Sequence, residues 1–77
     1  MKIKVYNKEN DEVLKIEFLK DGDLDCDYDM TFFGLSQIGD SITLYKNDTG
    51  EALFSMRRGS MGTYIDLLEF GYTIEIY

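Results

Sequence analysis

Hydrophobic and polar residues alternate one by one along much of this chain. The longest such run begins at Asp23, where aspartate or threonine occupies every second position as far as Thr31 and less polar residues lie between them. Shorter alternating runs span residues 2–6, 13–19, 41–46 and 51–56. A period of two residues predicts β-strands with one buried face, because successive side chains of a strand point to opposite sides.

The alternation also predicts how neighbouring strands pair. A three-residue loop, Lys20–Gly22, keeps the apolar side chains of the two flanking strands on one face, whereas a two-residue turn would mix core and solvent positions. In that register Lys15 lies opposite Asp27, and Glu17 lies opposite Asp25. The apolar pairs expected from the same rule are Ile3–Ile16, Val5–Leu14, Leu14–Tyr28, Ile16–Cys26, Phe18–Leu24, Ile42–Met56 and Leu44–Phe54.

The C-terminal part of the chain allows two interpretations. Residues 60–70 fit a short helix with an apolar stripe, but Gly62 and several residues of weak helix preference disfavour it. The alternative is two strands joined by a turn at Phe70–Gly71, and we favour this alternative because it gives a continuous uncharged face. Its expected pairs are Met56–Ile65, Phe54–Leu67, Leu67–Ile74 and Ile65–Ile76.

These patterns together predict a mainly β fold. We expect residues 1–77 to form a single domain, an antiparallel meander of six or seven strands that closes into a small sandwich or a partly open barrel. The segment Gly34–Gly39 interrupts the alternation, and we expect it to turn a corner between strands. The helix at residues 60–70 is the one departure from an all-strand fold that the pattern allows.

Composition bounds the setting in which the chain works. Cys26 is the only cysteine, so the fold cannot depend on an internal disulfide. No N-terminal run resembles a signal peptide, and no stretch approaches the roughly 20 apolar residues of a membrane helix. We therefore expect a soluble, cytoplasmic protein.

The charge is concentrated in one short segment. The net charge is −7, and residues 21–29 hold five aspartates without a single base. Nucleic acids and anionic membranes repel such a surface, so neither is an expected direct partner. A charged partner of this chain would carry a basic surface.

Enzyme chemistry has little support in the sequence. The chain contains no histidine, the side chain that titrates near neutral pH. Cys26 has the parity of the buried positions, which is typical of a small core residue rather than a nucleophile. One cysteine without histidine cannot supply a usual zinc site. We therefore expect neither a catalytic site nor a cofactor.

The aspartate spacing imitates a calcium-binding loop, but only in part. If Asp21 is the first ligand, Asp23, Asp25, Asp27 and Asp29 follow at the odd positions. The sixth position, which requires glycine, is then Cys26, and the twelfth, which requires glutamate, is Phe32. The sequence therefore leaves a low-affinity divalent-ion site as an alternative.

Two surfaces are candidates for binding another protein. The first is the acidic face formed by Asp21, Asp23, Asp25, Asp27 and Asp29, whose rival interpretation is a face that only keeps the strand soluble. The second contains Tyr45, Arg57 and Tyr64, with Arg57 expected opposite Tyr64 and Tyr77 beside it; tyrosine and arginine are typical of interface hot spots. Its rival interpretation is a second core layer that the N-terminal sheet covers.

We accordingly expect a non-catalytic acidic protein-binding module, such as a phage-type inhibitor of the anti-CRISPR or anti-restriction class. It would present the aspartates to a basic, nucleic-acid-binding site. The alternatives are the divalent-ion module and a self-assembling structural protein that uses the second surface.

Overall fold

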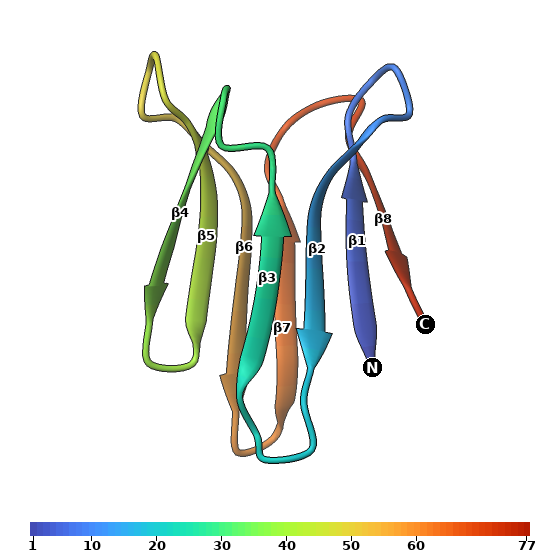
Figure 1. Ribbon diagram of the computed structural model, residues 1–77, viewed down its shortest axis with the longest axis vertical. Coiled ribbons are helices and arrows are strands. Elements are labelled where there is room, and N and C mark those ends of the chain that lie inside the picture. Colours follow the sequence, from blue (N-terminus) through green and yellow to red (C-terminus); the bar gives the residue numbers. More distant parts are fainter. The chain divides into compact units, whose positions relative to one another are not determined.

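The chain is built entirely from β-strands (Figure 1). The computed structural model describes all 77 residues, and the strands form two four-stranded antiparallel sheets, which confirms the predicted mainly β, antiparallel class. No helix has the length and apolarity that a membrane crossing would need. The strands are β1 Lys2–Tyr6, β2 Glu12–Phe18, β3 Leu24–Tyr28, β4 Phe33–Ile38, β5 Ser41–Lys46, β6 Ala52–Gly59, β7 Gly62–Leu67 and β8 Thr73–Ile76.

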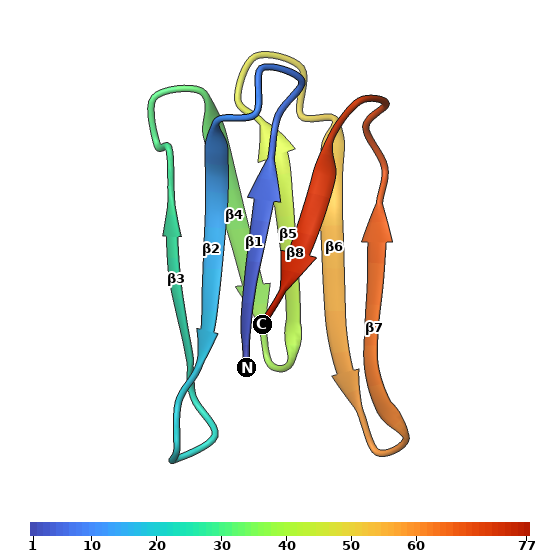
Figure 2. The same ribbon diagram turned by 90° about the vertical axis from the view of Figure 1, so that its right-hand side faces the viewer.

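The first sheet belongs to a unit made of residues 1–29 and 71–77, with strand order β3-β2-β1-β8 (Figure 2). All of the apolar pairs predicted for β1, β2 and β3 are present, as are Lys15 opposite Asp27 and Glu17 opposite Asp25. This agreement has a simple reason, since turn length and alternation leave only one register in which both strands bury the same face. The buried side chains of this unit are Ile3, Val5, Val13, Leu14 and Ile16.

The last strand does not lie where the alternation suggested. β8 pairs with β1, so that Ile74 lies opposite Val5 and Ile76 lies opposite Ile3, whereas we expected both isoleucines opposite β7. Two backbone hydrogen bonds extend this pairing: Lys2 N–H donates to the Tyr77 oxygen at 2.6 Å, and Tyr77 N–H donates to the Lys2 oxygen at 2.9 Å. The prediction was wrong because a uniform apolar face fits any apolar neighbour, and the edge of β1 that does not pair with β2 was also free to pair with β8.

The second sheet belongs to the unit of residues 30–70, with strand order β4-β5-β6-β7. Here too the predicted apolar pairs between β5, β6 and β7 are present. The interpretation of residues 60–70 as a helix is wrong, because Gly62–Leu67 is strand β7 and pairs with β6. The buried side chains of this unit are Ile42, Leu44, Leu53, Phe54 and Met56.

The segment Gly34–Gly39 is also a strand rather than a corner, which raises the number of strands to eight. The chain reverses only at Gly39, whose φ of 57° suits glycine. Gly34 hid the strand because glycine weakens an alternating pattern. In the fold it has a packing role: the Tyr45 ring lies over it, and a Cβ atom at Gly34 would come within 2.5 Å of that ring.

Candidate functional site

The acidic segment is an edge strand of the first sheet. Within β3, Asp25 and Asp27 are exposed, while Leu24, Cys26 and Tyr28 on the other parity are partly buried. The alternation therefore sorts the side chains as predicted, with the apolar ones on the face that also carries Ile3 and Ile16. β3 is shorter than the alternating sequence, because it ends at Tyr28.

Backbone pairing continues beyond both ends of β3. Leu19 N–H donates to the Asp23 carbonyl oxygen at 2.9 Å, and Asp29 N–H donates to the Val13 carbonyl oxygen at 3.3 Å. The four aspartates from Asp23 to Asp29 thus follow one another on a backbone that β2 holds in place; we call them the aspartate row. Asp21 lies outside the row, in the turn, where its Oδ1 accepts a hydrogen bond from Asp23 N–H at 3.0 Å.

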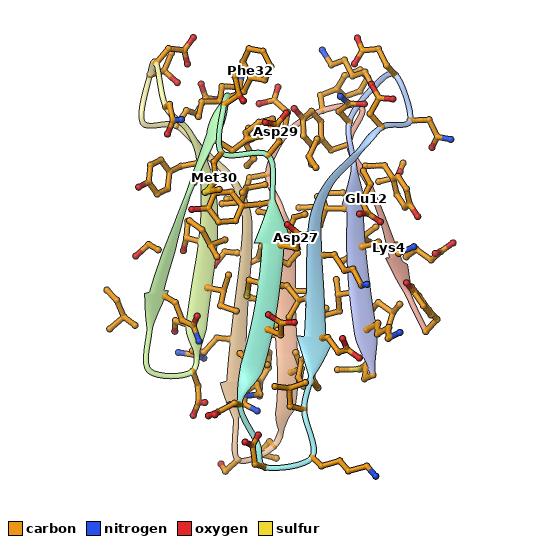
Figure 3. All side chains as sticks on the ribbon, viewed as in Figure 1. Lys4, Glu12, Asp27, Asp29, Met30 and Phe32 are labelled. Carbon is orange, nitrogen blue, oxygen red and sulfur yellow. The ribbon has the colours of Figure 1, made fainter.

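The neighbours of the row neutralise it only weakly. The ion pairs of this sheet join Lys2 to Glu17 at 3.9 Å and Lys4 to Glu12 at 3.3 Å, and neither Asp25 nor Asp27 takes part in one. Figure 3 shows Asp27 on β3, with Lys4 and Glu12 on the strands beyond it. The sheet therefore displays two unpaired carboxylates along its edge.

The thiol within this strand is poorly suited to nucleophilic chemistry. Partial burial raises the pKa of Cys26 above its ordinary value of 9.0, and the nearby Asp25 charge raises it further. At neutral pH very little thiolate is then present, and the thiolate is the reactive form.

The aspartates do not gather into a metal site. No group of three or more histidine, cysteine, aspartate or glutamate side chains is placed to hold an ion. The strand explains this, because side chains on one face of a strand are spaced about 6.6 to 6.8 Å apart. Calcium ligands lie only about 2.3 to 2.6 Å from the ion, so a straight row of this spacing cannot wrap around one.

The second candidate surface lies on the other sheet. Arg57 and Tyr64 are paired across β6 and β7, and the Arg57 guanidinium lies 5.5 Å from the centre of the Tyr64 ring. Tyr45 shares this face of the sheet but stands over Gly34. Tyr77 does not lie beside Tyr64 as expected, since it follows β8 in the first sheet and its ring faces Lys4 at 5.3 Å. Beside Tyr77, and with Glu12 as a second partner, the ammonium of Lys4 has a pKa above its ordinary value.

The centre of this second surface does not follow from the alternation of the sequence. On this face, a row of small side chains crosses the strands between the positions of Arg57 and Tyr45. It consists of Ser36, Thr43 and Ser55 and ends at Asp66. Part of this row lies in a shallow open hollow of about 620 Å³, with Ser41, Arg57 and Tyr64 at its side. Ser36, Thr43 and Ser55 lie on three different strands, β4, β5 and β6, so only the register of the sheet brings them into one line.

Comparison of the chain with protein-family models, curated proteins and solved structures finds no match. The geometry of these two surfaces therefore carries the functional conclusions.

Proposed function

We propose that this chain is a non-catalytic protein-binding domain that docks its aspartate row on a basic, nucleic-acid-binding surface of another protein. One observation carries the proposal: Asp25 and Asp27 are exposed on a hydrogen-bonded edge strand, and neither forms an ion pair. Carboxylates held in this way lose little conformational freedom when a partner's lysine or arginine binds them.

The spacing of the row suits a surface that grips a nucleic-acid backbone. Alternate residues of a strand repeat at about 6.6 to 6.8 Å. Two nucleotide steps along one strand of B-DNA cover about 6.8 Å. A row of aspartates can therefore offer negative charges to lysine and arginine side chains that are arranged to bind phosphates. We infer that the domain competes with nucleic acid for its partner.

The repulsion between like charges in this region also favours a binding role over a face that only keeps the strand soluble. Asp25 lies opposite Glu17, and like charges directly opposite each other destabilise a sheet. A mixture of lysine and glutamate would keep the edge soluble without this repulsion. On this basis we assign the chain to the functional class of phage-encoded inhibitors of host enzymes, such as anti-CRISPR and anti-restriction proteins.

The test compares two variants with the same change in net charge. The row variant is Asp23→Asn/Asp25→Asn/Asp27→Asn, and the control is Glu9→Gln/Asp48→Asn/Glu51→Gln, whose side chains are exposed outside the row. The wild-type chain is immobilised and used to capture proteins from a nuclease-treated bacterial lysate, and the captured proteins are identified. Calorimetry at low and high salt then measures their affinities for the wild type, the row variant and the control.

We expect the row variant to lose most of its affinity and its salt dependence, while the control stays close to wild type and added duplex DNA displaces the wild-type chain. Equal weakening of both variants would show that only net charge matters. Unchanged binding by the row variant would show that the aspartates are not the site.

A further inference from the structure

The second sheet has a face that most of its buried residues do not occupy. It is the face opposite Ile42, Leu44, Phe54 and Met56, and we call it the polar face of the second sheet. Across the strands its side chains form three rows, which the pairing defines as Ile38–Ser41–Arg57–Tyr64, Ser36–Thr43–Ser55–Asp66, and Gly34–Tyr45 with Leu68 on the same side.

Large apolar side chains stand exposed on this face. Ile38 is 77% exposed, Leu68 is 56% exposed and Tyr64 is 51% exposed. They belong to the two outer rows, and the hollow of about 620 Å³ is lined by Ser55 and Asp66 of the row between them, together with Arg57 and Tyr64. Exposed apolar patches that lie beside polar residues mark surfaces that bind protein.

The same face carries two charges of opposite sign that do not neutralise each other. Arg57 lies opposite Tyr64, and Asp66 is two residues further along β7, which is the diagonal position. Diagonal neighbours across two strands are roughly 7–8 Å apart. Both side chains are exposed, and neither forms an ion pair. Arg57 is steadied by the Tyr64 ring, 5.5 Å away, so its charge is already oriented before any partner arrives.

A cation and an anion placed side by side make the face complementary to itself. A two-fold axis that lies in the plane of the face, midway between the two residues, sets Arg57 over Asp66 of a second copy and Asp66 over Arg57 of that copy. Such isologous contacts are the usual basis of symmetric dimers. The two pairs would form together, and the apolar side chains around them would be covered at the same time.

The distribution of charge also favours a second copy at this face rather than at the other sheet. Residues 30–70 carry three bases and five acids, whereas the aspartate row lies entirely in the first unit. Repulsion between identical chains is therefore weaker at the polar face of the second sheet. We propose that this face is a homodimer interface in which Arg57 of each copy pairs with Asp66 of the other. The proposal does not depend on the aspartate row.

The experiment uses charge reversal and mixing. Sedimentation velocity over a wide range of concentrations measures the dimerisation of wild type, Arg57→Asp and Asp66→Arg. We expect wild type to dimerise and each single variant to lose roughly tenfold or more in dimerisation constant, because like charges then face each other. In a mixture of the two variants each charge meets its opposite, so we expect heterodimers to form with an affinity close to that of wild type.

Two controls keep the result interpretable. Asp48→Arg makes the same charge change as Asp66→Arg but lies in the β5–β6 turn, and it should leave dimerisation unchanged. Circular dichroism confirms that each single variant is folded. A wild-type chain that stays monomeric at every concentration overturns the proposal, and so do folded single variants that fail to associate when mixed. The row variant Asp23→Asn/Asp25→Asn/Asp27→Asn should still dimerise, so failure of the dimer and failure of the acidic site can be distinguished.

Discussion

The Cys26 side chain is affected both by burial and by a nearby negative charge. Its side chain lies on the apolar face of β3, opposite Ile16, and is partly buried there. Its sequence neighbour Asp25 points to the other face and contributes negative charge. Burial and charge both disfavour the thiolate, so the pKa of the thiol rises above 9.0.

The Cys26 thiol is therefore expected to become reactive only at a higher pH than an unperturbed thiol. The rate of Cys26 alkylation by iodoacetamide, followed by mass spectrometry, should have its midpoint above pH 9.0 in the folded chain and near that value in urea. Asp25→Asn should lower the folded midpoint, and Asp48→Asn should not. Because the folded pKa is the higher one, the thiol's contribution to stability is present below pH 9.0 and is lost as the pH rises through the folded pKa. Equal midpoints for Asp25→Asn and wild type would contradict the role of the Asp25 charge.

At the scale of the element, β3 combines a regular strand with an unfavourable charge pattern. Its two exposed aspartates are nearly equivalent, since both lie on the same face of the same edge strand. They differ in what lies across the ladder, because Asp25 faces Glu17 and Asp27 faces Lys15. The strand therefore contains its own matched pair for measuring the cost of the acidic row.

Asp25→Asn is expected to stabilise the fold and Asp27→Asn to leave it unchanged or destabilise it, although both change the net charge equally. Cross-strand charge pairs contribute roughly 0.2–1 kcal/mol each, which sets the size of the difference. Urea unfolding followed by circular dichroism measures it for both variants at low salt. High salt should shrink the difference by screening. If both variants gained the same stability, net charge rather than pairing would govern the strand.

For the whole molecule, the feature that matters most is the pairing of the first strand with the last. β1 and β8 bring together residues more than 70 positions apart, such as Ile3 and Ile76. Lys2 and Tyr77 exchange two hydrogen bonds, so Val5 and Ile74 form a non-hydrogen-bonded pair, in which the Cα atoms of a ladder approach most closely. That separation suits a disulfide.

A cross-link can therefore test which strand β8 pairs with. In a Cys26→Ser background, Val5→Cys/Ile74→Cys should oxidise to an intramolecular disulfide, detected by mass spectrometry before and after reduction. The control Leu67→Cys/Ile74→Cys corresponds to the register that the sequence suggested, and it should stay reduced because β7 and β8 belong to different sheets. Closing so long a loop should also stabilise the chain by about 2–4 kcal/mol. A disulfide in the control and none in the first variant would show that β8 pairs with β7 instead.

The candidate sites were open to sequence reasoning to different degrees. The parity of Asp23, Asp25, Asp27 and Asp29 follows from the alternation alone. The pairing of Arg57 with Tyr64 follows from the alternation and the length of the loop between the two strands. The departure of Asp21 into the turn did not follow, because a turn residue has no fixed parity. Nor did the isolation of Arg57 and Asp66 as neighbouring opposite charges, because only the structure shows that neither residue has an ion partner.

The sequence by itself determined seven of the eight strands and the register of the hairpins β1–β2, β2–β3, β5–β6 and β6–β7, since a period of two residues and a short loop admit only one pairing that buries both apolar faces. Only the tertiary structure decided that β4 is a strand, that β8 joins β1 and that the strands divide into two sheets. The physical reason is that alternation states which face of a strand is buried but not which edge it meets. Backbone hydrogen bonds at an edge are nearly the same for every neighbour, so the choice between edges depends on packing across the sheet.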